Sequence, residues 1–412
     1  MKRLLMAAVM VMLAAAAFAT DANVTNAPYS AVPNDTGDDT SAIQAAVDAV
    51  GTSGGTVTVP AGTYFVDNTV AVHLTNGMTF SMLSGAVLQA MTNTTDLTRV
   101  LYIKSATNVT VTGGTIKGDR GGHVLPASEG AYYGMGIWID GANNVTLSNV
   151  TASEFFGDGF FIANSLVSSN IVMTGCTADH NQRQGLSIES VIGVLVTNCT
   201  FSRTEGATNG PEYGIDIEPY NSLIARDITI VNCLFSNNAG GGIIAAPMGS
   251  AATISNVLIT GNTVISNGWS LGSSSPNGGI VMRVNNGTAS FNRLDNNTTL
   301  GMYSYSSMGT NYWLTNRVTR SLHGTHAGGE YGSGLIAYNL TNFVAQGNIL
   351  TNNANYGLVV VEPYSLVITN GNVQSGNGVG DGGVVAQNDP VTVTNSTLTA
   401  TTVNVVNLRI GQ

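Results

Sequence analysis

Hydrophobic and polar residues alternate in short segments along most of the chain, and these segments recur at intervals of about 22 to 37 residues. Many repeats contain a glycine followed by four alternating residues, as in GIWID, GFFIA, GLSIE, GIDIE, GIIAA, GIVMR, GMYSY, GLIAY and GLVVV. A second strand-like segment, such as NNVTLSNVT or SNIVMTGCT, accompanies most of them. Alternation with a period of two is typical of β-strands, and a repeat of this length is typical of solenoids. The pattern therefore predicts an all-β fold of stacked coils.

Two residue types recur at fixed positions of the repeat. Asparagine tolerates left-handed backbone and bonds to neighbouring peptide groups, so a repeated asparagine predicts a sharp corner in each coil. The residues concerned are Asn181, Asn238, Asn267, Asn297 and Asn353. Three cysteines also share one register, at Cys176, Cys199 and Cys233, among residues typical of a core. We expect buried thiols there, and we assign them no chemistry.

The beginning of the repeat region has a different period. In DDTSAIQAAVDAV the apolar residues Ile43, Ala46, Val47 and Val50 recur at helical spacing, behind Asp and Thr residues that are candidates for an N-cap. A glycine pair and the strand-like TVTVPAGTYFV follow. We expect a short amphipathic helix that covers the open end of the coil stack, where core and backbone would otherwise be exposed.

The first 19 residues have the pattern of an export signal. Lys2 and Arg3 precede an apolar run, and Ala17-Phe18-Ala19 has the small-x-small form of a cleavage site. We therefore expect a secreted or periplasmic protein without a membrane span, since no other apolar run is long enough. The 14 basic and 24 acidic residues argue against nucleic acid and anionic membranes as partners, because both require clustered Lys and Arg.

The segment YSAVPNDTGDDTSAIQAAVDAVGTSGGTVTVPAGTYFV resembles the N-terminal cap and first coil of the pectate-lyase-like superfamily, and the later repeats resemble its coils. This resemblance implies a right-handed parallel β-helix. Residues 20–65 would form the cap helix and first coil, and residues 66–412 the remaining coils of the same domain. The superfamily includes glycoside hydrolases, polysaccharide lyases, uronate epimerases and phage tailspikes, so the reaction has to be inferred from the site.

Candidate catalytic residues come from the alternation itself. Residues one and three after each glycine are apolar and should point inward, so residues two and four should face solvent. This places Asp216 and Glu218 on one outward face and Glu189 one coil earlier, in a chain with only 9% charged residues. Adjacent coils lie about 4.8 Å apart, so Glu189 and Glu218 should stack, and one of the two should keep a proton. That residue would be a general acid, with Asp216 as base or nucleophile.

The same outward rows contain large aromatic residues on both sides of the carboxylates. Trp138 and Phe161 precede them, and Tyr303 and Tyr305 follow. Because sugar rings stack on aromatic faces, we expect these residues, together with Asp140 and Arg283 in the same rows, to bind a polysaccharide. The sequence therefore predicts a glycoside hydrolase, with no cofactor and no metal ligand assigned.

Several alternatives remain open. The carboxylates could bind Ca²⁺, form a solvated acidic ladder, or belong to a turn around Glu218-Pro219-Tyr220. In YGIDIE, Tyr213 and Asp216 are spaced like the Tyr and Asp of the YGFDPH motif of alginate C5-epimerases, but Glu218 stands where that family has histidine. A lyase or epimerase would use Tyr213, His180 or Arg183. A glycan-binding adhesin without activity is a third class. The C-terminal segment shows no cap, which leaves that edge available to a second copy of the chain.

Overall fold

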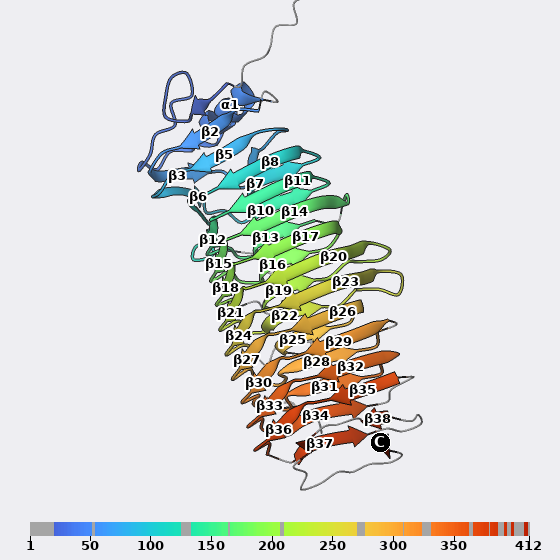
Figure 1. Ribbon diagram of the computed structural model, residues 1–412. Helices are drawn as coiled ribbons and strands as arrows, with labels where there is room; N and C mark the ends of the chain where they lie inside the picture. Colours follow the sequence, from blue (N-terminus) through green and yellow to red (C-terminus); the bar gives the residue numbers. More distant parts are fainter. Residues whose placement is uncertain are drawn as a thin grey trace, which may run out of the picture.

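A computed structural model shows an elongated stack of coils whose strands run parallel from one end to the other (Figure 1). The part of the chain that the structure describes comprises residues 20–51, 54–124, 133–163, 165–206, 210–269, 277–307, 309–323, 331–361, 366–378, 380–385, 391–393, 397–398 and 408–410. The predicted export signal at residues 1–19 lies outside these ranges. The fold is a right-handed parallel β-helix, as the sequence predicts.

Each coil contributes one strand to each of three parallel sheets, which we call sheets A, B and C. Sheet A has 15 strands: β1 (Ala22–Asn23), β2 (Thr56–Val59), β5 (Thr79–Met82), β8 (Thr107–Thr112), β11 (Asn143–Ser148), β14 (Ser168–Thr174), β17 (Val191–Thr197), β20 (Ile224–Val231), β23 (Thr253–Thr260), β26 (Asn285–Ser290), β29 (Thr310–Leu314), β32 (Asn342–Gln346), β35 (Leu366–Asn370), β38 (Val391–Val393) and β40 (Leu408–Ile410).

Sheet B has 13 strands: β3 (Gly62–Val66), β6 (Ala86–Ala90), β9 (Thr115–Lys117), β12 (Thr151–Ser153), β15 (Thr177–Asp179), β18 (Thr200–Ser202), β21 (Leu234–Ser236), β24 (Thr263–Ile265), β27 (Arg293–Asp295), β30 (Arg317–Thr319), β33 (Ile349–Thr351), β36 (Val373–Ser375) and β39 (Thr397–Leu398).

Sheet C has 12 strands: β4 (Val72–His73), β7 (Leu97–Lys104), β10 (Tyr133–Asp140), β13 (Asp158–Ile162), β16 (Gln184–Ile188), β19 (Tyr213–Ile217), β22 (Gly241–Ala245), β25 (Gly278–Met282), β28 (Met302–Tyr305), β31 (Leu335–Tyr338), β34 (Tyr356–Val361) and β37 (Gly380–Val385). Its pairing aligns the glycine-led segments as the sequence predicts. For example, Leu186 pairs with Ile215, and Ser187 pairs with Asp216.

The glycine that begins each segment is required by the close approach of neighbouring coils. A Cβ atom on Gly214 would lie 2.8 Å from the carbonyl oxygen of Gly242, and one on Gly242 would lie 2.6 Å from that of Gly279. The same contact recurs further up the stack, where a Cβ on Gly279 would lie 2.4 Å from the carbonyl oxygen of Gly301. No side chain fits between two backbones at these distances, so glycine marks the coil boundary in the sequence.

Buried asparagines connect successive coils at two corners. At one corner, the amide Nδ2 of Asn238 donates to Oδ1 of Asn267 at 2.9 Å, and Asn267 donates in the same way to Asn297 at 3.0 Å. Asn181 and Asn353 occupy equivalent buried positions in other coils and bond to backbone or to the next asparagine, as the sequence predicts.

The second corner carries a further ladder of asparagines, which continues the cysteine register. Its members are Asn262, Asn292, Asn316, Asn348 and Asn372, each amide donating to the next at 2.8 to 3.0 Å. In the preceding coils the position is held by Cys176, Cys199 and Cys233, all buried and free. The backbone N–H of Cys233 donates to Oδ1 of Asn262, which joins the two series. The expectation of a buried thiol stack is confirmed.

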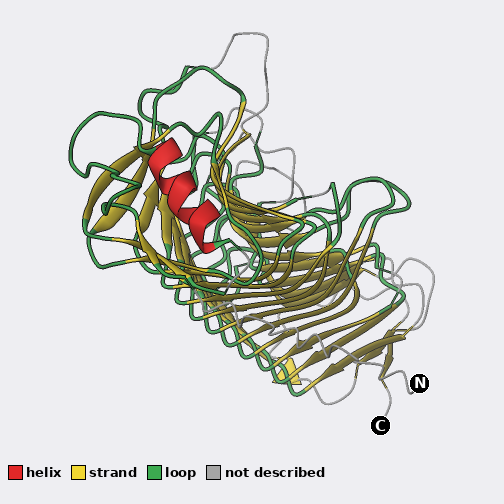
Figure 2. Cartoon of the chain, turned by 90° about the horizontal axis from the view of Figure 1, so that it is seen from above, coloured by secondary structure: helices red, strands yellow, loops and turns green. Residues whose placement is uncertain are grey.

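The predicted helix is α1 (Thr40–Val50), and it lies at the N-terminal end of the stack (Figures 1 and 2). Its buried residues include Ile43, Ala46, Val47 and Val50, which join the single large core that runs through the coils. Of the aspartates expected at the helix start, Asp38 accepts the backbone N–H of Thr40, the first helical residue, at 2.9 Å. Asp39 directly precedes the helix but does not cap it, and its carboxylate accepts the backbone N–H groups of Val32 and Phe65.

Among the described helices, none is both long and apolar enough to cross a membrane.

We predict that replacing Gly242 by alanine lowers the free energy of unfolding by about 1–3 kcal/mol, because the added Cβ overpacks the boundary between two coils. Chemical denaturation followed by circular dichroism measures the change. Gly121→Ala is the matched control, since a Cβ there meets nothing within 4 Å. Equal stability of the two variants would contradict the close-approach explanation.

Candidate functional site

The carboxylates predicted from the sequence gather on the outer face of sheet C, across strands β13, β16 and β19. Phe161, Ser187 and Asp216 occupy one register on these three strands. Glu189 and Glu218 follow directly after β16 and β19, where each backbone N–H donates to the preceding coil at 2.9 Å. The structure therefore brings together Asp216, Glu218 and Glu189 as predicted, although Asp216 is only 4% exposed and Glu189 only 5%. The expectation that this acidic face is open to solvent is wrong for these two residues.

A buried ion pair forms the floor of this site. Asp158 is completely buried, and Arg183 contacts it with both ends of the guanidinium, Nε to Oδ1 at 2.8 Å and Nη2 to Oδ2 at 2.5 Å. Ser187 donates its hydroxyl to the same Oδ2 at 2.8 Å. Burial on its own would lower the pKa of Arg183, but the charge of Asp158 outweighs it and raises that pKa. Arg183 therefore remains charged.

Sequence reasoning missed Asp158, because it stands immediately before its glycine, outside the alternating positions. The signal available was its place beside the aligned glycine of a chain poor in charge, one coil before Arg183. Gln184 was missed for the same reason, and Tyr220 because it lies beyond the alternating residues of its strand. All three contact the predicted site residues.

Among the described residues, one side chain donates to Asp216. Gln184 donates its Nε2 to Oδ2 of Asp216 at 2.8 Å, and its Oε1 accepts the backbone N–H of Tyr213 at 2.7 Å. The amide of Gln184 is thereby fixed in one orientation. Burial raises the pKa of Asp216 well above its ordinary value, the charge of Glu218 raises it further, and Arg183 opposes both effects only in part.

Glu218 is more accessible than Asp216 and has a different partner. Tyr220 donates its hydroxyl to Oε2 of Glu218 at 2.8 Å, which favours the ionised carboxylate. Burial raises the pKa of Glu218 nevertheless, and the hydrogen bond from Tyr220 and the charge of Arg183 limit the rise. Of the two neighbouring carboxyls, Asp216 therefore holds a proton more readily, and Glu218 loses one more readily.

Aromatic residues flank the carboxyls on both sides, as the sequence predicts. On the C-terminal side, Tyr303 and Tyr305 stack with their ring centroids 4.9 Å apart. Arg283 acts on Tyr305, since its charge lowers the pKa of that phenol against a larger rise from burial. These three residues lie in the rows predicted for substrate contact.

On the N-terminal side, the aromatic residues pack against one another. Trp138 meets Phe161 edge to face, with centroids 4.8 Å apart, and Arg99 lies 4.4 Å from the centroid of the Trp138 ring. Phe161 is only 4% exposed because Met135 and Trp138 cover it. The expectation of an exposed Phe161 is therefore wrong, whereas Trp138 remains partly accessible.

Asp140 also differs from the expectation of a residue facing the substrate. It is only 1% exposed, and its Oδ1 accepts the backbone N–H of Leu166 at 3.0 Å. The hydroxyl of Tyr102 lies 3.4 Å from its Oδ2. The contact with Leu166 attaches the segment that follows strand β13 to the preceding coil. Asp140 therefore holds two coils together and is not exposed to a substrate.

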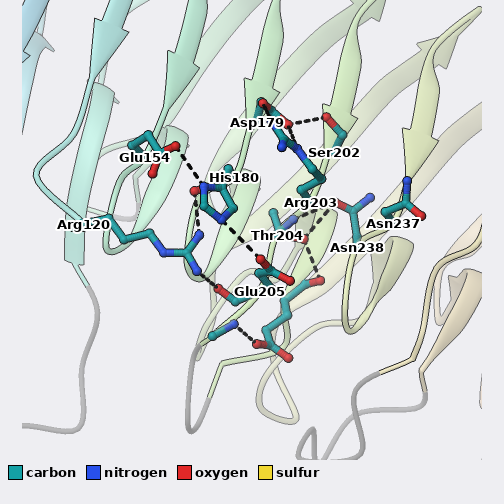
Figure 3. A network of polar contacts seen from close by, with 12 residues as sticks. Arg120, Glu154, Asp179, His180, Ser202, Arg203, Thr204, Glu205, Asn237 and Asn238 are labelled. Atoms are coloured by element: carbon teal, nitrogen blue, oxygen red, sulfur yellow. Dashed lines mark hydrogen bonds and ion pairs between the residues drawn. The ribbon is translucent and has the colours of Figure 1, made fainter.

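His180 belongs to a second polar network, shown in Figure 3. Its Nδ1 lies 2.9 Å from Oε1 of Glu154, and its Nε2 lies 3.2 Å from Oε1 of Glu205. Arg120 donates to the backbone oxygen of His180 at 2.8 Å. His180 follows strand β15 of sheet B with a left-handed backbone, φ 56°, and both ring nitrogens are directed to these glutamates. The prediction that it joins the Asp216 group is therefore wrong in placement.

Tyr213 lies inside an outer hydrophobic cluster, completely buried with Ile244, Val281 and the two stacked tyrosines. Burial raises the pKa of Tyr213 well above its ordinary value, and the charge of Asp216 adds to the rise. The phenol is therefore held in its neutral form. In the described part of the chain, no group of three or more His, Cys, Asp or Glu side chains is arranged to hold a metal ion.

Comparisons with known proteins agree with this architecture. Residues 58–222 match the family model for the right handed beta helix region. The SPbeta prophage-derived uncharacterized protein YorA of Bacillus subtilis (strain 168) is 28% identical over 244 residues, which cover 52% of this chain and 41% of YorA. The chain thus matches less than half the length of this relative.

Solved structures share the fold at low identity. The mannuronan C-5 epimerase AlgE6 A-module of Azotobacter vinelandii has a TM-score of 0.66 at 20% identity, covering 90% of this chain and all of that one. The adhesin PfbA of Streptococcus pneumoniae has a TM-score of 0.64 at 17% identity, covering 87% and 92%. A family 28 exopolygalacturonase of Yersinia enterocolitica has 0.53 at 16%, covering 86% and 75%. The right-handed β-helix fold that the resemblance implies is confirmed, and the structural neighbours include carbohydrate-related proteins.

We predict that Asp216→Asn changes how stability depends on pH. Because burial raises the pKa of Asp216 above its value in the unfolded chain, the stability that this group contributes is complete below about pH 4 and is lost as pH rises toward the folded-state pKa. Asparagine keeps an oxygen for Gln184 and does not ionise.

Denaturation curves at a series of pH values from about 4 to 8 test this. Wild type should lose more stability with rising pH than Asp216→Asn, whereas Asp227→Asn, an exposed substitution on strand β20, should follow wild type. Parallel curves for wild type and Asp216→Asn would show that Asp216 does not hold a proton in the folded protein.

Proposed function

We propose that this protein is an exported enzyme that cleaves glycosidic bonds of a polysaccharide at the outer face of sheet C. The observation that supports the proposal most directly is the buried carboxyl of Asp216 beside the more accessible carboxyl of Glu218, with the pKa of both raised. A neutral carboxylic acid next to an ionised carboxylate is the pair that glycoside hydrolysis needs. Export is part of the proposal and is based on the predicted signal at residues 1–19.

The roles that we propose differ from those expected on the sequence alone. Asp216 is the general acid, because its pKa is the more strongly raised, and it protonates the leaving oxygen. Glu218 is the base or nucleophile, because the hydrogen bond from Tyr220 favours its ionised form. Glu189 adds negative charge that helps Asp216 keep its proton. Tyr303, Tyr305 and Trp138 provide rings on which sugars stack.

Two contacts favour hydrolysis over a lyase or epimerase reaction. A lyase must neutralise the carboxylate of a uronate, and the guanidinium of Arg183 is already matched by both oxygens of Asp158. A tyrosine base would have to ionise, and burial and the charge of Asp216 raise the pKa of Tyr213. The adhesin alternative is supported only by the shared fold of PfbA, which has no bearing on the carboxyl pair.

We predict that Asp216→Asn and Glu218→Gln each lower the rate of polysaccharide cleavage by about 10²–10⁴-fold, the range for loss of a general acid or base. Digestion of a panel of neutral and acidic glycans, read by new reducing ends and by ultraviolet absorbance of unsaturated uronates, measures the change. The control is Asp227→Asn, which should cleave like wild type because that residue is exposed on sheet A.

The outcomes separate the candidate reactions. Reducing ends without new absorbance, lost in both variants, support hydrolysis at this face. New absorbance would identify a lyase and overturn the proposed reaction, and full activity in both variants would overturn the proposed site. Binding without any turnover would leave the adhesin. Parallel digests with Ca²⁺ or a chelator test the alternative that the carboxylates bind this ion.

A further inference from the structure

The outer face of sheet B contains the same acid–arginine pair at two places along the stack. In the first, Arg203 contacts both oxygens of Asp179 from the next coil, with Ser202 donating to Asp179 at 2.7 Å. In the second, Arg320 contacts both oxygens of Asp295, at 2.7 and 2.5 Å. Both arginines have left-handed backbone, with φ of 55° and 54°. The pair is thus a repeated device that connects two coils at a corner.

The second pair has a hydroxyl neighbour like the first. Thr319 precedes Arg320 as Ser202 precedes Arg203, and its hydroxyl donates to Asp295 at 3.0 Å. In both places, one acid, one arginine and one hydroxyl are enough to connect the two coils. The connection does not require any further charged residue.

The surroundings of the two pairs differ in charge. Beside the first pair, the exposed row of sheet B carries Thr177 and Thr200, which pair across strands β15 and β18. Beside the second pair, the equivalent positions carry Arg293 and Arg317, which pair across strands β27 and β30. Two arginines therefore stand in adjacent coils, about 4.8 Å apart along the stack, where like charges repel. The acid–arginine pair that connects the coils accounts for the presence of Arg320 but not for that of Arg293 and Arg317.

Asp295 cannot neutralise all three arginines. Its Oδ1 accepts from Arg320 and Thr319, and its Oδ2 accepts from Arg320, with Arg293 at a longer 3.4 Å. Within the residues that the structure describes, the guanidinium of Arg317 has no hydrogen-bond or ion-pair partner. Hydrogen bonds from Arg320 lower the pKa of Asp295, so the acid is ionised and the group has an excess of two positive charges. This excess stands in a chain whose net charge is −10.

The arginines surround a cavity. Its volume is about 230 Å³, and its lining consists of the three arginines and Asp295 together with Thr319, Thr351 and Asn352. The side chains of Arg293 and Arg320 are 58% and 61% exposed, so their guanidinium groups are accessible to a ligand. Guanidinium groups bind carboxylates and sulfates through paired N–H donors, and the threonine hydroxyls and the amide can bond to sugar hydroxyls.

We propose that this cavity is a binding site for a carboxylate- or sulfate-bearing saccharide, whose anionic group lies between Arg293 and Arg317. The site lies on sheet B and does not depend on the catalytic function proposed for sheet C. It gives the protein a second point of attachment to an acidic polysaccharide. Since arginine stays protonated at all physiological pH values, binding should weaken with salt and change little between about pH 5 and 8.

The test is isothermal titration of the full chain with oligogalacturonate, dextran sulfate, neutral dextran and sodium sulfate. The decisive variant is the double substitution Arg293→Thr and Arg317→Thr, which installs the residues that the first pair has at these positions. Because the same fold carries threonine there, the variant should fold, and its melting temperature checks this. We expect a loss of at least tenfold in affinity for the acidic saccharides and no binding of neutral dextran by either protein.

The matched control is Lys117→Thr with Arg226→Thr, which removes the same charge from exposed positions elsewhere. It should bind like wild type. An equal loss in the charge control would overturn the site in favour of a general charge effect. Retained binding in the arginine variant, or a wild type that binds no acidic saccharide, would also overturn it. Binding of inorganic sulfate without either saccharide would overturn the assignment to a saccharide.

Discussion

The structure depends on one constraint, the in-register stacking of parallel coils whose backbones bond to each other along the whole length of the molecule. At the glycine positions two coils approach so closely that a Cβ on Gly242 would lie 2.6 Å from the next carbonyl oxygen. At the corners the same spacing allows one side-chain amide to bond to the next, as Asn262 does to Asn292. A residue's environment is therefore set mainly by the residues at the same position one coil before and after.

This constraint also explains how a chain with only 9% charged residues brings several of them together in one site. Asp158, Arg183 and Asp216 are separated by about one coil each in the sequence, and stacking brings them to one face of sheet C. Arg183 is paired with Asp158, and the donor to Asp216 is the uncharged amide of Gln184. The carboxyls of Asp216 and Glu218 therefore have little positive charge left to compensate them. Burial in this arrangement raises the pKa of Asp216, and the charge of Glu218, two residues along the same segment, raises it further. On sheet B, the same stacking places positive charge beside positive charge.

The sequence alone predicted the features that depend on the regular spacing of residues along the chain. The stacked all-β coils, the inward positions of sheet C, the cap helix with Ile43 and Val47 in the core, and the buried cysteines follow from the spacing of the residues, and the family resemblance implied the right-handed parallel β-helix. The division of each coil among three sheets was not predicted. The sequence also did not predict how far a residue on the outer face is covered. Phe161 and Asp140 point outward as expected, yet Trp138 covers the first and the segment containing Leu166 contacts the second. Such coverage comes from neighbours outside the alternating pattern. The direction of His180 was also inaccessible, because it depends on a left-handed backbone at the end of a strand.

The change from thiols to amides at one corner has a consequence for how the molecule could have changed its length. From Asn262 to Asn372 each coil offers the same acceptor to the coil before it and the same donor to the coil after it, so any of these coils is a complete unit. Duplication or loss of one such unit would leave every amide with an equivalent partner. In the coils of Cys176, Cys199 and Cys233 the same event would separate Asp158, Arg183 and Asp216. The asparagine ladder at this corner therefore permits a change of length, whereas the aligned charges restrict one across Asp158, Arg183 and Asp216 and again across Arg293 and Arg317.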